Sequence, residues 1–464
     1  SYKDADPSVC SHCGSPSLNQ DPDVLDTWYS SGLWPISTLG WPEKTPELET
    51  FYPTLRFDEA RGGKEARALM ETGSDILTFW VSRMVTMCTH FMDGKLPFED
   101  VYLHAMVRDE KGQKMSKTKG NVVDPLDVTE KHGADALRLT LIALSGQGRN
   151  VNLDLKRLEG YSAFINKLWN ASRFALMQLE EKGVRSYQDP LQDTASLDFV
   201  DRWLLSELEA TVQKVNSDLT NYRPDAAFQA IYQFAWYEFC DWYLELVKLK
   251  NGKLDTLAYA LETILKLLHP MAPMVTEEIY GELPGAHKGQ LLIQPFPSAG
   301  NEMLFTLYSA EDRKKFGALR AVVDGIRNFR TENKIAPRAA IDAYVETKEP
   351  ELWQGIESLA KGLARLGSVH LNAAAPAGSS GKVATDSFTL TIPLEGLVDK
   401  SAEKARLQNE IKKARADVEF TEKRLGNEAF VAKAKPELVA KERAGLEGFR
   451  EKLRVLEEAL AKLG

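Results

Sequence analysis

Cysteine is scarce in this chain of 464 residues. There are only four, Cys10, Cys13, Cys88 and Cys240. Four cysteines are too few for a disulfide-stapled scaffold of this size, so a reducing setting, the cytoplasm, is the expected location. Long apolar runs are also lacking, since the most apolar stretch, residues 76–92, is interrupted by Arg83 and His90. We therefore expect a buried helix there, with no signal peptide and no membrane partner.

An overall positive charge is lacking as well. The net charge is −9, which excludes a protein that coats nucleic acid through bulk charge. The charge is uneven, because residues 398–464 carry 16 Lys and Arg against 13 Asp and Glu. Hydrophobic content of 43% and charged content of 27% are those of a globular protein. The length predicts about three domains.

The segment that points most directly to chemistry is residues 107–121, Val-Arg-Asp-Glu-Lys-Gly-Gln-Lys-Met-Ser-Lys-Thr-Lys-Gly-Asn. Five cations accompany two carboxylates in this run, which follows a strand predicted near residues 101–107. Lysine ammoniums are movable point charges, and Gly112 and Gly120 let the backbone come close, so the loop suits a polyphosphate. On charge alone, a solvated basic surface loop is the commoner interpretation.

The order of residues within this lysine loop resembles the Lys-Met-Ser-Lys-Ser loop of class I aminoacyl-tRNA synthetases. Thr118 replaces the last serine and keeps its hydroxyl. The resemblance implies that the loop binds ATP through Lys114, Met115, Ser116, Lys117 and Thr118. It also implies a catalytic role for Lys114 and Lys117, which would contact the triphosphate with the help of Mg²⁺.

Two further residues gain a role from the same resemblance. Residues 26–31, Asp-Thr-Trp-Tyr-Ser-Ser, resemble a segment of valyl-tRNA synthetases whose tryptophan lines the amino-acid pocket. Trp28 by itself would be a core aromatic, but a flat apolar ring also suits a branched aliphatic side chain. Asp75 follows a strand expected at residues 68–73, and it either caps the next helix, contacts substrate or the adenylate ribose, or does both. Residues 55–67 are expected to be a charged surface insertion.

Cys10 and Cys13 form a Cys-x-x-Cys pair followed by glycine, which is the spacing of half a tetrahedral zinc site. No second pair of this kind follows in the sequence. Two free cysteines in a turn therefore remain an equally good interpretation, and Zn²⁺ stays an open question.

The rest of the chain changes character three times. Residues 151–338 have helical patterns, including an aromatic stripe at 234–246 whose Glu238, Asp241 and Glu245 would share one helix face. This part resembles an anticodon-binding bundle, with candidate anticodon contacts at Arg327, Arg330 and Arg338.

Residues 339–396 predict strands at 340–346, 368–372 and 387–393, a helix at 350–366 and a flexible loop at 373–382. Heptads in residues 397–464 predict two helices with a break at Gly426 and Asn427. Such a hairpin serves either oligomerisation or tRNA binding, and the resemblance favours tRNA.

The expected fold is the α/β half of a class I nucleotide-binding (Rossmann-type) domain, followed by a helical bundle, a small α/β connector and an antiparallel coiled-coil hairpin. The corresponding domains are residues 1–150, 151–338, 339–396 and 397–464. The resemblance implies ATP-dependent ligation of valine to tRNA(Val) through a valyl-adenylate, performed by a monomer.

One family motif is missing. No His-Ile-Gly-His-type sequence is present, nor the first half of the nucleotide-binding sheet, nor an editing domain. The chain is therefore expected to be the carboxyl-terminal portion of a valyl-tRNA synthetase and to be inactive alone. The alternative is a non-catalytic tRNA-binding fragment or one half of a split enzyme; a structural coiled-coil protein would explain only the tail.

Overall fold

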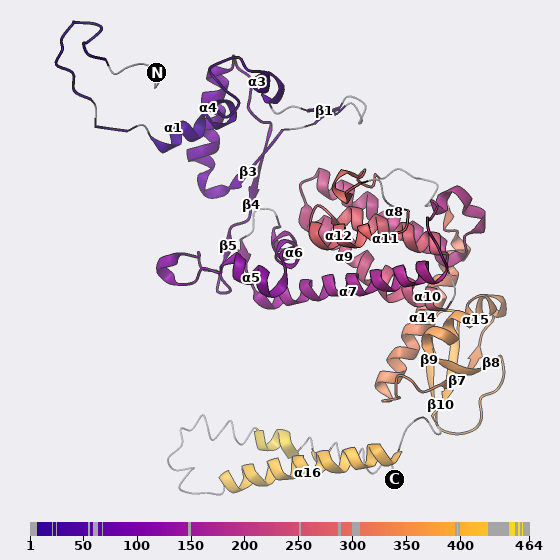
Figure 1. Cartoon of the computed structure of the whole chain (residues 1–464). Coiled ribbons are helices and arrows are strands. Elements are labelled where there is room, and N and C mark those ends of the chain that lie inside the picture. Colours follow the sequence, from indigo (N-terminus) through magenta and orange to yellow (C-terminus); the bar gives the residue numbers. More distant parts are fainter. Residues whose placement is uncertain are drawn as a thin grey trace. The chain divides into compact units, whose positions relative to one another are not determined.

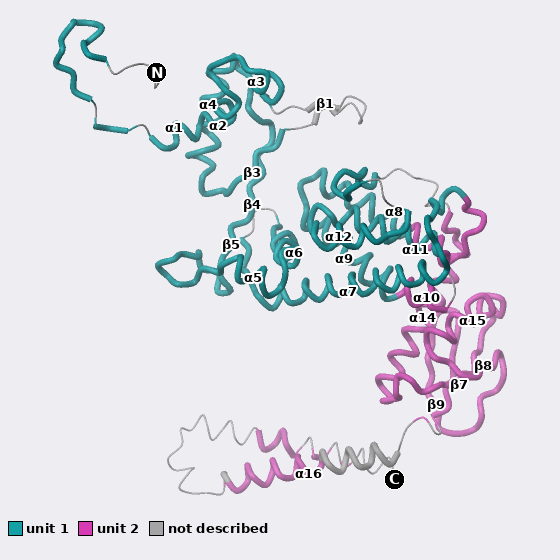
Figure 2. The backbone as a smooth tube through the Cα atoms, in the orientation of Figure 1, with its two compact units in different colours: residues 1–192, 207–241, 254–301 teal, residues 193–206, 242–253, 302–464 magenta. Residues whose placement is uncertain are grey.

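The computed structural model describes residues 7–20, 22–24, 26–53, 56–58, 64–66, 68–146, 150–249, 252–285, 289–298, 307–394, 397, 400–425, 445–450, 453–454 and 457 (Figure 1). The chain forms two compact units (Figure 2). Unit 1 comprises residues 1–192, 207–241 and 254–301, and unit 2 comprises residues 193–206, 242–253 and 302–464.

The amino-terminal part of unit 1 alternates short helices and strands. Its helical segments are α1 (Thr27–Gly32), α2 (Trp34–Ser37), α3 (Pro46–Phe51), η2 (Ser74–Ile76), η3 (Leu77–Val81), α4 (Ser82–Phe91), η4 (Lys117–Lys119), α5 (Pro125–His132) and α6 (Ala134–Leu144). Its strands are β1 (Arg56–Asp58), β2 (Lys64–Ala66), β3 (Leu69–Gly73), β4 (Asp100–His104), β5 (Val107–Arg108) and β6 (Val151–Asn152).

Two strand pairs in this part are parallel. β3 pairs with β4, with Leu69 opposite Asp100 and Gly73 opposite His104. The connection between them runs through η2, η3 and α4, which is the crossover that parallel strands require. β5 pairs with β6 in the same sense. The strand predicted at residues 68–73 is thus present from Leu69, and this part of the chain is α/β as expected.

The apolar helix predicted at residues 76–92 is present but not regular. It begins with the 3₁₀ turn η2, continues as the five-residue π-helix η3, and becomes α-helical at Ser82. Met84 and Cys88 on α4 are fully buried and belong to two separate apolar clusters. The 55–67 insertion contains the antiparallel pair β1–β2, and residues 59–63 lie outside the described part of the chain.

Helices dominate residues 155–332. They are α7 (Leu155–Glu181), η5 (Pro190–Ser196), α8 (Phe199–Thr220), α9 (Pro224–Gln233), η6 (Phe234–Tyr243), α10 (Leu244–Lys248), α11 (Leu254–Leu268), α12 (Pro273–Gly281), η7 (Leu291–Ile293) and α14 (Ala310–Glu332). The described residues thus contain the helices predicted for this region, which are divided between the two units.

Helix α6 is fastened to the start of α12 by two charged side chains. The Arg138 guanidinium donates to the carbonyl oxygens of Pro270 and Met271 at 2.9 and 3.1 Å. The buried Asp135 carboxylate accepts from the backbone N–H of Val275 at 2.7 Å. These bonds satisfy backbone groups that a helix junction interrupted by prolines leaves without helical partners.

The aromatic stripe at residues 234–246 departs from the predicted α-helix. Residues Phe234–Tyr243 form the π-helix η6, and α-helical hydrogen bonding resumes at Leu244. Asp241 pairs with Lys167 of α7, with 2.6 Å between Nζ and Oδ1. The same ammonium lies 3.8 Å from the ring centroid of Trp236. Glu238, Asp241 and Glu245 are each half-buried, and the face predicted to be shared by them stays a prediction.

Unit 2 contains a four-stranded sheet covered by helices. Its elements are α14, α15 (Pro350–Ala364), β7 (Ile341–Glu346), β8 (Leu366–Leu371), β9 (Ser380–Ala384) and β10 (Thr389–Pro393). The strand order is β8-β7-β10-β9, and only the β7–β8 pair of this sheet is parallel. The small α/β connector is thus present, but part of the loop predicted at residues 373–382 is strand β9.

Arg202 and Asp312 form a bidentate ion pair within unit 2, with N–O distances of 2.8 and 2.7 Å. Asp312 is also the third helical residue of α14 and completes a capping box with Ser309. Burial would raise the pKa of Asp312, but hydrogen bonds from Arg202 and Ser309 outweigh it and hold the pKa below its usual value.

The described tail consists of α16 (Lys400–Leu425) and parts of residues 445–457, which lie side by side (Figure 1). Arg415 pairs with Glu457 at 2.6 Å, and Arg450 pairs with Glu422 at 2.8 Å. Four of the predicted heptad positions are buried: Ile411, Ala414, Thr421 and Leu446. The predicted break at Gly426 and Asn427 lies outside the described residues, and the coiled-coil geometry stays a prediction.

Candidate active site

The site is built where parallel strands β3 and β4 end, at Gly73 and His104. In open α/β sheets, ligands bind beyond the carboxyl ends of the strands. A Cβ atom at position 73 would lie 2.8 Å from Oδ1 of Asp75 and 3.4 Å from Sδ of Met106. A side chain at position 73 would therefore displace the Asp75 carboxylate from its place over the strand end.

Asp75 does not cap the following helix. It lies inside the 3₁₀ turn Ser74–Ile76, and neither this turn nor η3 has a side-chain cap hydrogen bond. The prediction of an N-cap was wrong because the chain makes a tight turn before the helix begins. The carboxylate oxygen Oδ2 instead lies 3.9 Å from Nζ of Lys114 in the lysine loop.

This ion pair is exposed, with 73% and 50% of the Lys114 and Asp75 side chains accessible. Exposed pairs contribute about 0–1 kcal/mol to stability. The pair matters because of its position: it shows that the lysine loop lies next to the end of β3.

Trp28 contacts the same segment at Phe79. Its indole stacks on the ring of Phe79 in η3, with centroids 5.9 Å apart and an interplanar angle of 28°. The neighbouring Trp80 donates from Nε1 to the carbonyl oxygen of Ser31 at 3.0 Å, which fastens α1 to η3. Phe79 is half-exposed, so this aromatic pair presents an apolar wall. Residues 74–81 thus connect Trp28 and Lys114.

The lysine loop has a defined backbone. Arg108 and Lys114 form an isolated antiparallel bridge, and Gly112 adopts a φ of +74° in the turn between them. The side chain of Ser116 then caps the 3₁₀ turn Lys117–Lys119 by accepting from the backbone N–H of Lys119. Its hydroxyl also lies 3.1 Å from the Thr118 hydroxyl.

Exposure differs along the loop. Lys114, Lys117 and Thr118 are exposed, while Met115 and Ser116 are half-buried. The ammoniums of Lys114 and Lys117 are therefore accessible to solvent, Lys114 beside the Asp75 carboxylate, while the residues between them fix the backbone. This division is what the spacing of apolar and charged residues in the loop requires.

Sequence reasoning missed two residues that organise this loop, Asp109 and Asn121. The Asp109 carboxylate accepts from the backbone N–H groups of Lys111 and Gln113, at 3.0 and 2.7 Å. It also accepts from Nδ2 of Asn121 at 2.9 Å. An aspartate three positions before a glycine is a common turn signal, so Asp109 was detectable, whereas the partnership with Asn121 was not.

Three family models match this chain. The family model described as class I tRNA synthetases (I, L, M and V) matches residues 2–154. The model for the anticodon-binding domain of tRNA ligase matches residues 201–345, and the valyl tRNA synthetase tRNA binding arm matches residues 399–464.

Two curated relatives are valine–tRNA ligases from Syntrophotalea carbinolica and Geobacter sulfurreducens. Each is 42% identical to this chain over 475 residues, which cover 99% of the chain. The chain belongs to the valyl-tRNA synthetase family. It spans about half the length of these relatives, 50% and 51% respectively.

One solved structure, at lower sequence identity, shares its fold with part of this chain. It is the ternary complex of a leucyl enzyme from Agrobacterium radiobacter K84, titled LeuRS-tRNA-LeuAMS. The TM-score is 0.53 at 23% identity, over 64% of this chain and 35% of that one. At this identity the likeness concerns the fold alone.

Cys10 and Cys13 are the residues on which a zinc site would depend, and zinc binding by them stays a prediction. Cys10 and Cys13 lie in a turn in which the backbone N–H of Gly14 donates to the carbonyl oxygen of Cys10 at 2.9 Å. Hydrogen bonds from Cys13 and His12 lower the pKa of the Cys10 thiol, as in a metal knuckle. Among the described residues, however, no group of three or more His, Cys, Asp or Glu gathers around a metal position. Two thiols alone do not complete a tetrahedral zinc site.

Of the candidate anticodon contacts, Arg330 is excluded. Its side chain is buried and donates to the carbonyl oxygens of Ala336, Ala364 and Arg365. Burial, with Arg365 nearby, lowers its pKa. Arg330 therefore joins α14 to the end of α15, while Arg327 and Arg338 are exposed.

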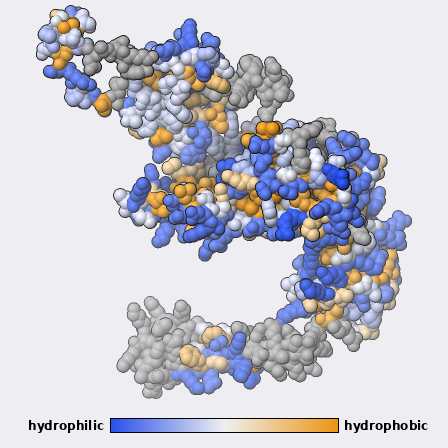
Figure 3. All heavy atoms as spheres, in the orientation of Figure 1, coloured by the Kyte–Doolittle hydropathy of each residue, from blue (hydrophilic) through white to orange (hydrophobic). Residues whose placement is uncertain are grey.

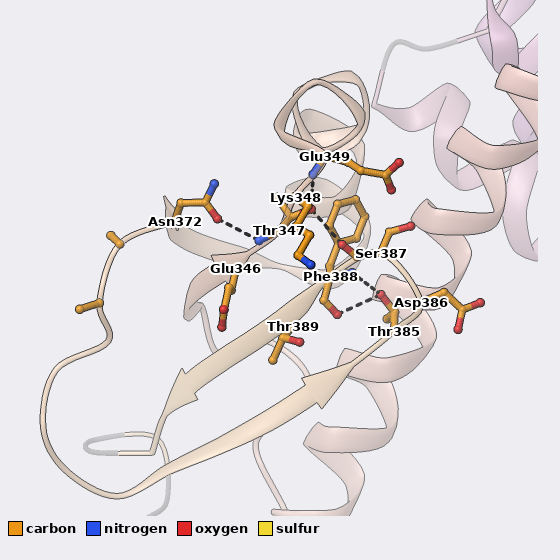
Figure 4. Close-up of a pocket in the computed structure, with 12 residues that line it drawn as sticks. Glu346, Thr347, Lys348, Glu349, Asn372, Thr385, Asp386, Ser387, Phe388 and Thr389 are labelled. Atoms are coloured by element: carbon orange, nitrogen blue, oxygen red, sulfur yellow. Dashed lines mark hydrogen bonds between the residues drawn. The ribbon is translucent and has the colours of Figure 1, made fainter.

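Unit 2 also contains an open cavity of about 1000 Å³ at one end of its sheet (Figure 4). Polar groups around it bond to each other. The Thr347 backbone N–H donates to the Asn372 amide oxygen at 2.8 Å, and the Thr347 hydroxyl donates to the Ser387 carbonyl oxygen at 2.9 Å. The cavity belongs to unit 2, whereas every residue predicted to bind ATP belongs to unit 1. We assign it no role in the reaction.

Proposed function

We propose that this chain supplies the carboxyl-terminal half of a valine–tRNA ligase active site. In this proposal it takes part in ATP-dependent ligation of valine to tRNA(Val) through a valyl-adenylate. One observation carries the proposal: the aromatic wall of Trp28 and Phe79 and the ammonium of Lys114 both adjoin residues 74–81. An apolar wall beside a cationic loop suits a substrate pair of aliphatic amino acid and triphosphate.

In the first step, the valine carboxylate attacks the α-phosphate of ATP and pyrophosphate leaves. The nucleophile is already an anion, so no general base is needed, and positioning and charge neutralisation supply the rate. Lys114 and Lys117 are the proposed catalytic residues and would neutralise charge on the phosphates. Each preorganised donor of this kind contributes about 3 kcal/mol to lowering the barrier.

The remaining loop residues have supporting roles in this proposal. Met115 fills the half-buried side of the loop, and the hydroxyls of Ser116 and Thr118 lie beside the ATP-binding ammoniums. Asp75 is the proposed substrate or ribose contact, supported by its position at the end of β3. Trp28 would line the valine pocket.

Mg²⁺ is expected to accompany ATP. Among described residues, no group of three or more possible ligands is found, and Mg²⁺ in such sites is held largely by substrate phosphates and water. The chemistry it would supply is neutralisation of phosphate charge. In the second step, a ribose hydroxyl of the terminal adenosine of the tRNA attacks the carbonyl carbon of the adenylate, so that the valyl ester forms and AMP and a proton leave.

We further propose the division into residues 1–150, 151–338, 339–396 and 397–464, with an antiparallel coiled-coil arm at the end. The three family matches support this order. The proposed partners are valine, ATP and tRNA(Val), and the proposed state is a cytoplasmic monomer.

The chain alone is proposed to be inactive, because it lacks a His-Ile-Gly-His-type motif. The test is charging of tRNA(Val) with radiolabelled valine, by the chain alone and after addition of the amino-terminal half of the Geobacter sulfurreducens relative. We expect no charging alone and charging by the mixture. Charging by the chain alone would contradict the proposed half-site.

The same absent motif favours a second candidate, a non-catalytic tRNA-binding module. It predicts tRNA binding by the chain alone and no charging by the mixture. Charging by the mixture would exclude it. A split enzyme would behave as the first proposal does.

A further inference from the structure

The lysine loop is held by one side-chain pair that the proposed chemistry does not use. The Asp109 carboxylate lies at its start and the Asn121 carboxamide at its end, twelve positions apart. Nδ2 of Asn121 donates to Oδ2 of Asp109 at 2.9 Å, which closes the loop into a ring. We call this pair the loop clasp.

Both members of the clasp also bond to the backbone that they enclose. Oδ1 of Asp109 accepts from the N–H groups of Lys111 and Gln113. Oδ1 of Asn121 accepts from the N–H of Ser116 at 2.9 Å. Nδ2 of Asn121 also lies within 3.3 Å of the carbonyl oxygen of Lys114. The clasp therefore fixes the two backbone positions on either side of Met115.

If only the charge of the Asp109 carboxylate mattered, this residue would be unfavourable in the loop. A negative charge in a polyphosphate-binding loop repels the ligand. Here, hydrogen bonds from Asn121, Gln113 and Lys111 occupy both oxygens of Asp109 and hold its pKa below the usual value. The carboxylate thus serves the loop backbone, and it stays ionised throughout the neutral range.

We propose that Asp109 and Asn121 are positioning residues, which set the lysine loop so that the ammoniums of Lys114 and Lys117 meet the triphosphate. This inference rests on the proposed function. A loop that is ordered before ATP binds loses less conformational entropy in the transition state. The clasp acts through Lys114 and Lys117 and does not itself touch the phosphates.

Two explanations of the role of Asp109 predict opposite effects of the substitution Asp109→Asn. If only charge mattered, Asp109→Asn would raise the local net charge from +3 to +4 and favour phosphate binding. If position matters, the same change removes an acceptor from the clasp and slows the reaction. Glu110→Gln is the matched control, because it removes the same charge one residue away at an exposed side chain outside the clasp.

The first arm of the experiment needs no catalysis. Amide hydrogen exchange over residues 109–121 is measured on the 464-residue chain. We expect exchange about tenfold faster in Asp109→Asn, the loss of one hydrogen bond to a charged group, and unchanged in Glu110→Gln. Equal exchange in the two variants overturns the clasp.

A reciprocal exchange tests the pairing itself. Asn121→Asp alone places two carboxylates together and should loosen the loop. The double variant Asp109→Asn with Asn121→Asp restores one donor facing one acceptor. We expect it to recover most of the lost protection, and no recovery would overturn the pairing.

The second arm uses the enzyme completed with the amino-terminal half. Valine-dependent ATP–pyrophosphate exchange should show kcat about tenfold lower in Asp109→Asn, with KM for ATP little changed. Glu110→Gln should keep the rate. A rate in Asp109→Asn equal to that of Glu110→Gln would overturn the positioning role. If the completed enzyme is inactive with the unaltered chain, the proposed function fails while the first arm still decides the clasp.

Discussion

Single residues of the lysine loop have different surroundings. Lys114 has the Asp75 carboxylate at 3.9 Å, whereas the structure describes no carboxylate within ion-pair distance of Lys117. An ammonium with no competing anion gives its full charge to a phosphate. Lys117 should therefore contribute more than Lys114 to the proposed neutralisation of ATP.

We predict that Lys117→Ala in the completed enzyme lowers the rate of adenylate formation about 100-fold, the usual effect of removing one preorganised donor. Binding of tRNA(Val) should change little, because the loop is proposed to act on ATP. Single-turnover formation of valyl-adenylate and a filter-binding assay measure the two quantities. Lys111→Ala, in the same loop but outside the motif, is the control. A larger effect on tRNA binding than on adenylate formation would contradict the assigned role.

A second prediction at this scale concerns Asp312. Its pKa is lower in the folded protein than in the unfolded chain, so its ion pair with Arg202 stabilises the fold above the unfolded pKa. That stability is lost as the pH falls through the folded pKa, below about pH 4. Asp312→Asn should lower the free energy of unfolding of unit 2 by about 2 kcal/mol at pH 7, and by less at pH 3. Urea unfolding measures both values.

The neighbouring Glu311→Gln is the control for Asp312. Its side chain is 75% exposed and forms an ordinary helical pair with Lys315. Such pairs contribute only about 0.3–0.5 kcal/mol. An equal loss in both variants at neutral pH would show that the bidentate pair with Arg202 has no special weight.

At the scale of elements, the sequence predicted the helices and strands whose apolar residues repeat with a regular period. Strands β7 and β10 were expected at residues 340–346 and 387–393, because apolar and polar residues alternate there. Strand β9 was hidden behind the Gly- and Ser-rich residues 377–381, which have turn composition. The π-helices η3 and η6 could not be predicted, since local sequence pattern gives the α-helical period only.

The sequence indicated the residues of the candidate site, but not how they are connected. Lys114, Lys117 and Trp28 stand in motifs, so the sequence could name them as candidates, and their roles stay predictions. Their connection through residues 74–81 depends on a π-helix and a 3₁₀ turn, which only the structure reveals. The helix cap assigned to Asp75 was wrong for the same reason.

Alanine substitution at two glycines of α14 is predicted to change the stability of the protein in opposite directions. A Cβ at Gly325 would lie 2.5 Å from Cγ1 of the buried Val383 on β9, whereas one at Gly317 meets nothing within 4 Å. Gly325→Ala should destabilise the protein by about 1–2 kcal/mol through overpacking. Gly317→Ala should stabilise it by up to about 1 kcal/mol, the difference in helix propensity. Thermal unfolding of both variants tests this, and equal shifts would contradict the close packing of α14 on β9.

At the scale of the whole molecule, the tail is basic while the chain is acidic. The visible face mixes hydrophilic and hydrophobic residues (Figure 3), and none of the helices that the structure describes is both long and apolar enough to cross a membrane.

Large apolar side chains are exposed near the candidate site, among them Trp34 and Phe79. A two-stranded parallel sheet such as β3–β4 is normally completed by further strands and covered on both faces. These features support the proposal that another segment completes the site.

Removing residues 398–464 should weaken binding of tRNA(Val) by the chain. The segment carries an excess of Lys and Arg, so the lost affinity should be larger at low salt than at high salt. Fluorescence anisotropy with labelled tRNA at several salt concentrations measures the slope. The same affinity and slope without the tail would remove it as a tRNA contact.

The most direct test of the account is valine-dependent ATP–pyrophosphate exchange, because it isolates the first step and needs no tRNA. The account predicts no exchange with the chain alone and clear exchange after the amino-terminal half is added, with valine much preferred over a larger aliphatic amino acid. Exchange by the chain alone, or none by the mixture, would contradict the claim that the lysine loop and the wall of Trp28 form one half of the site.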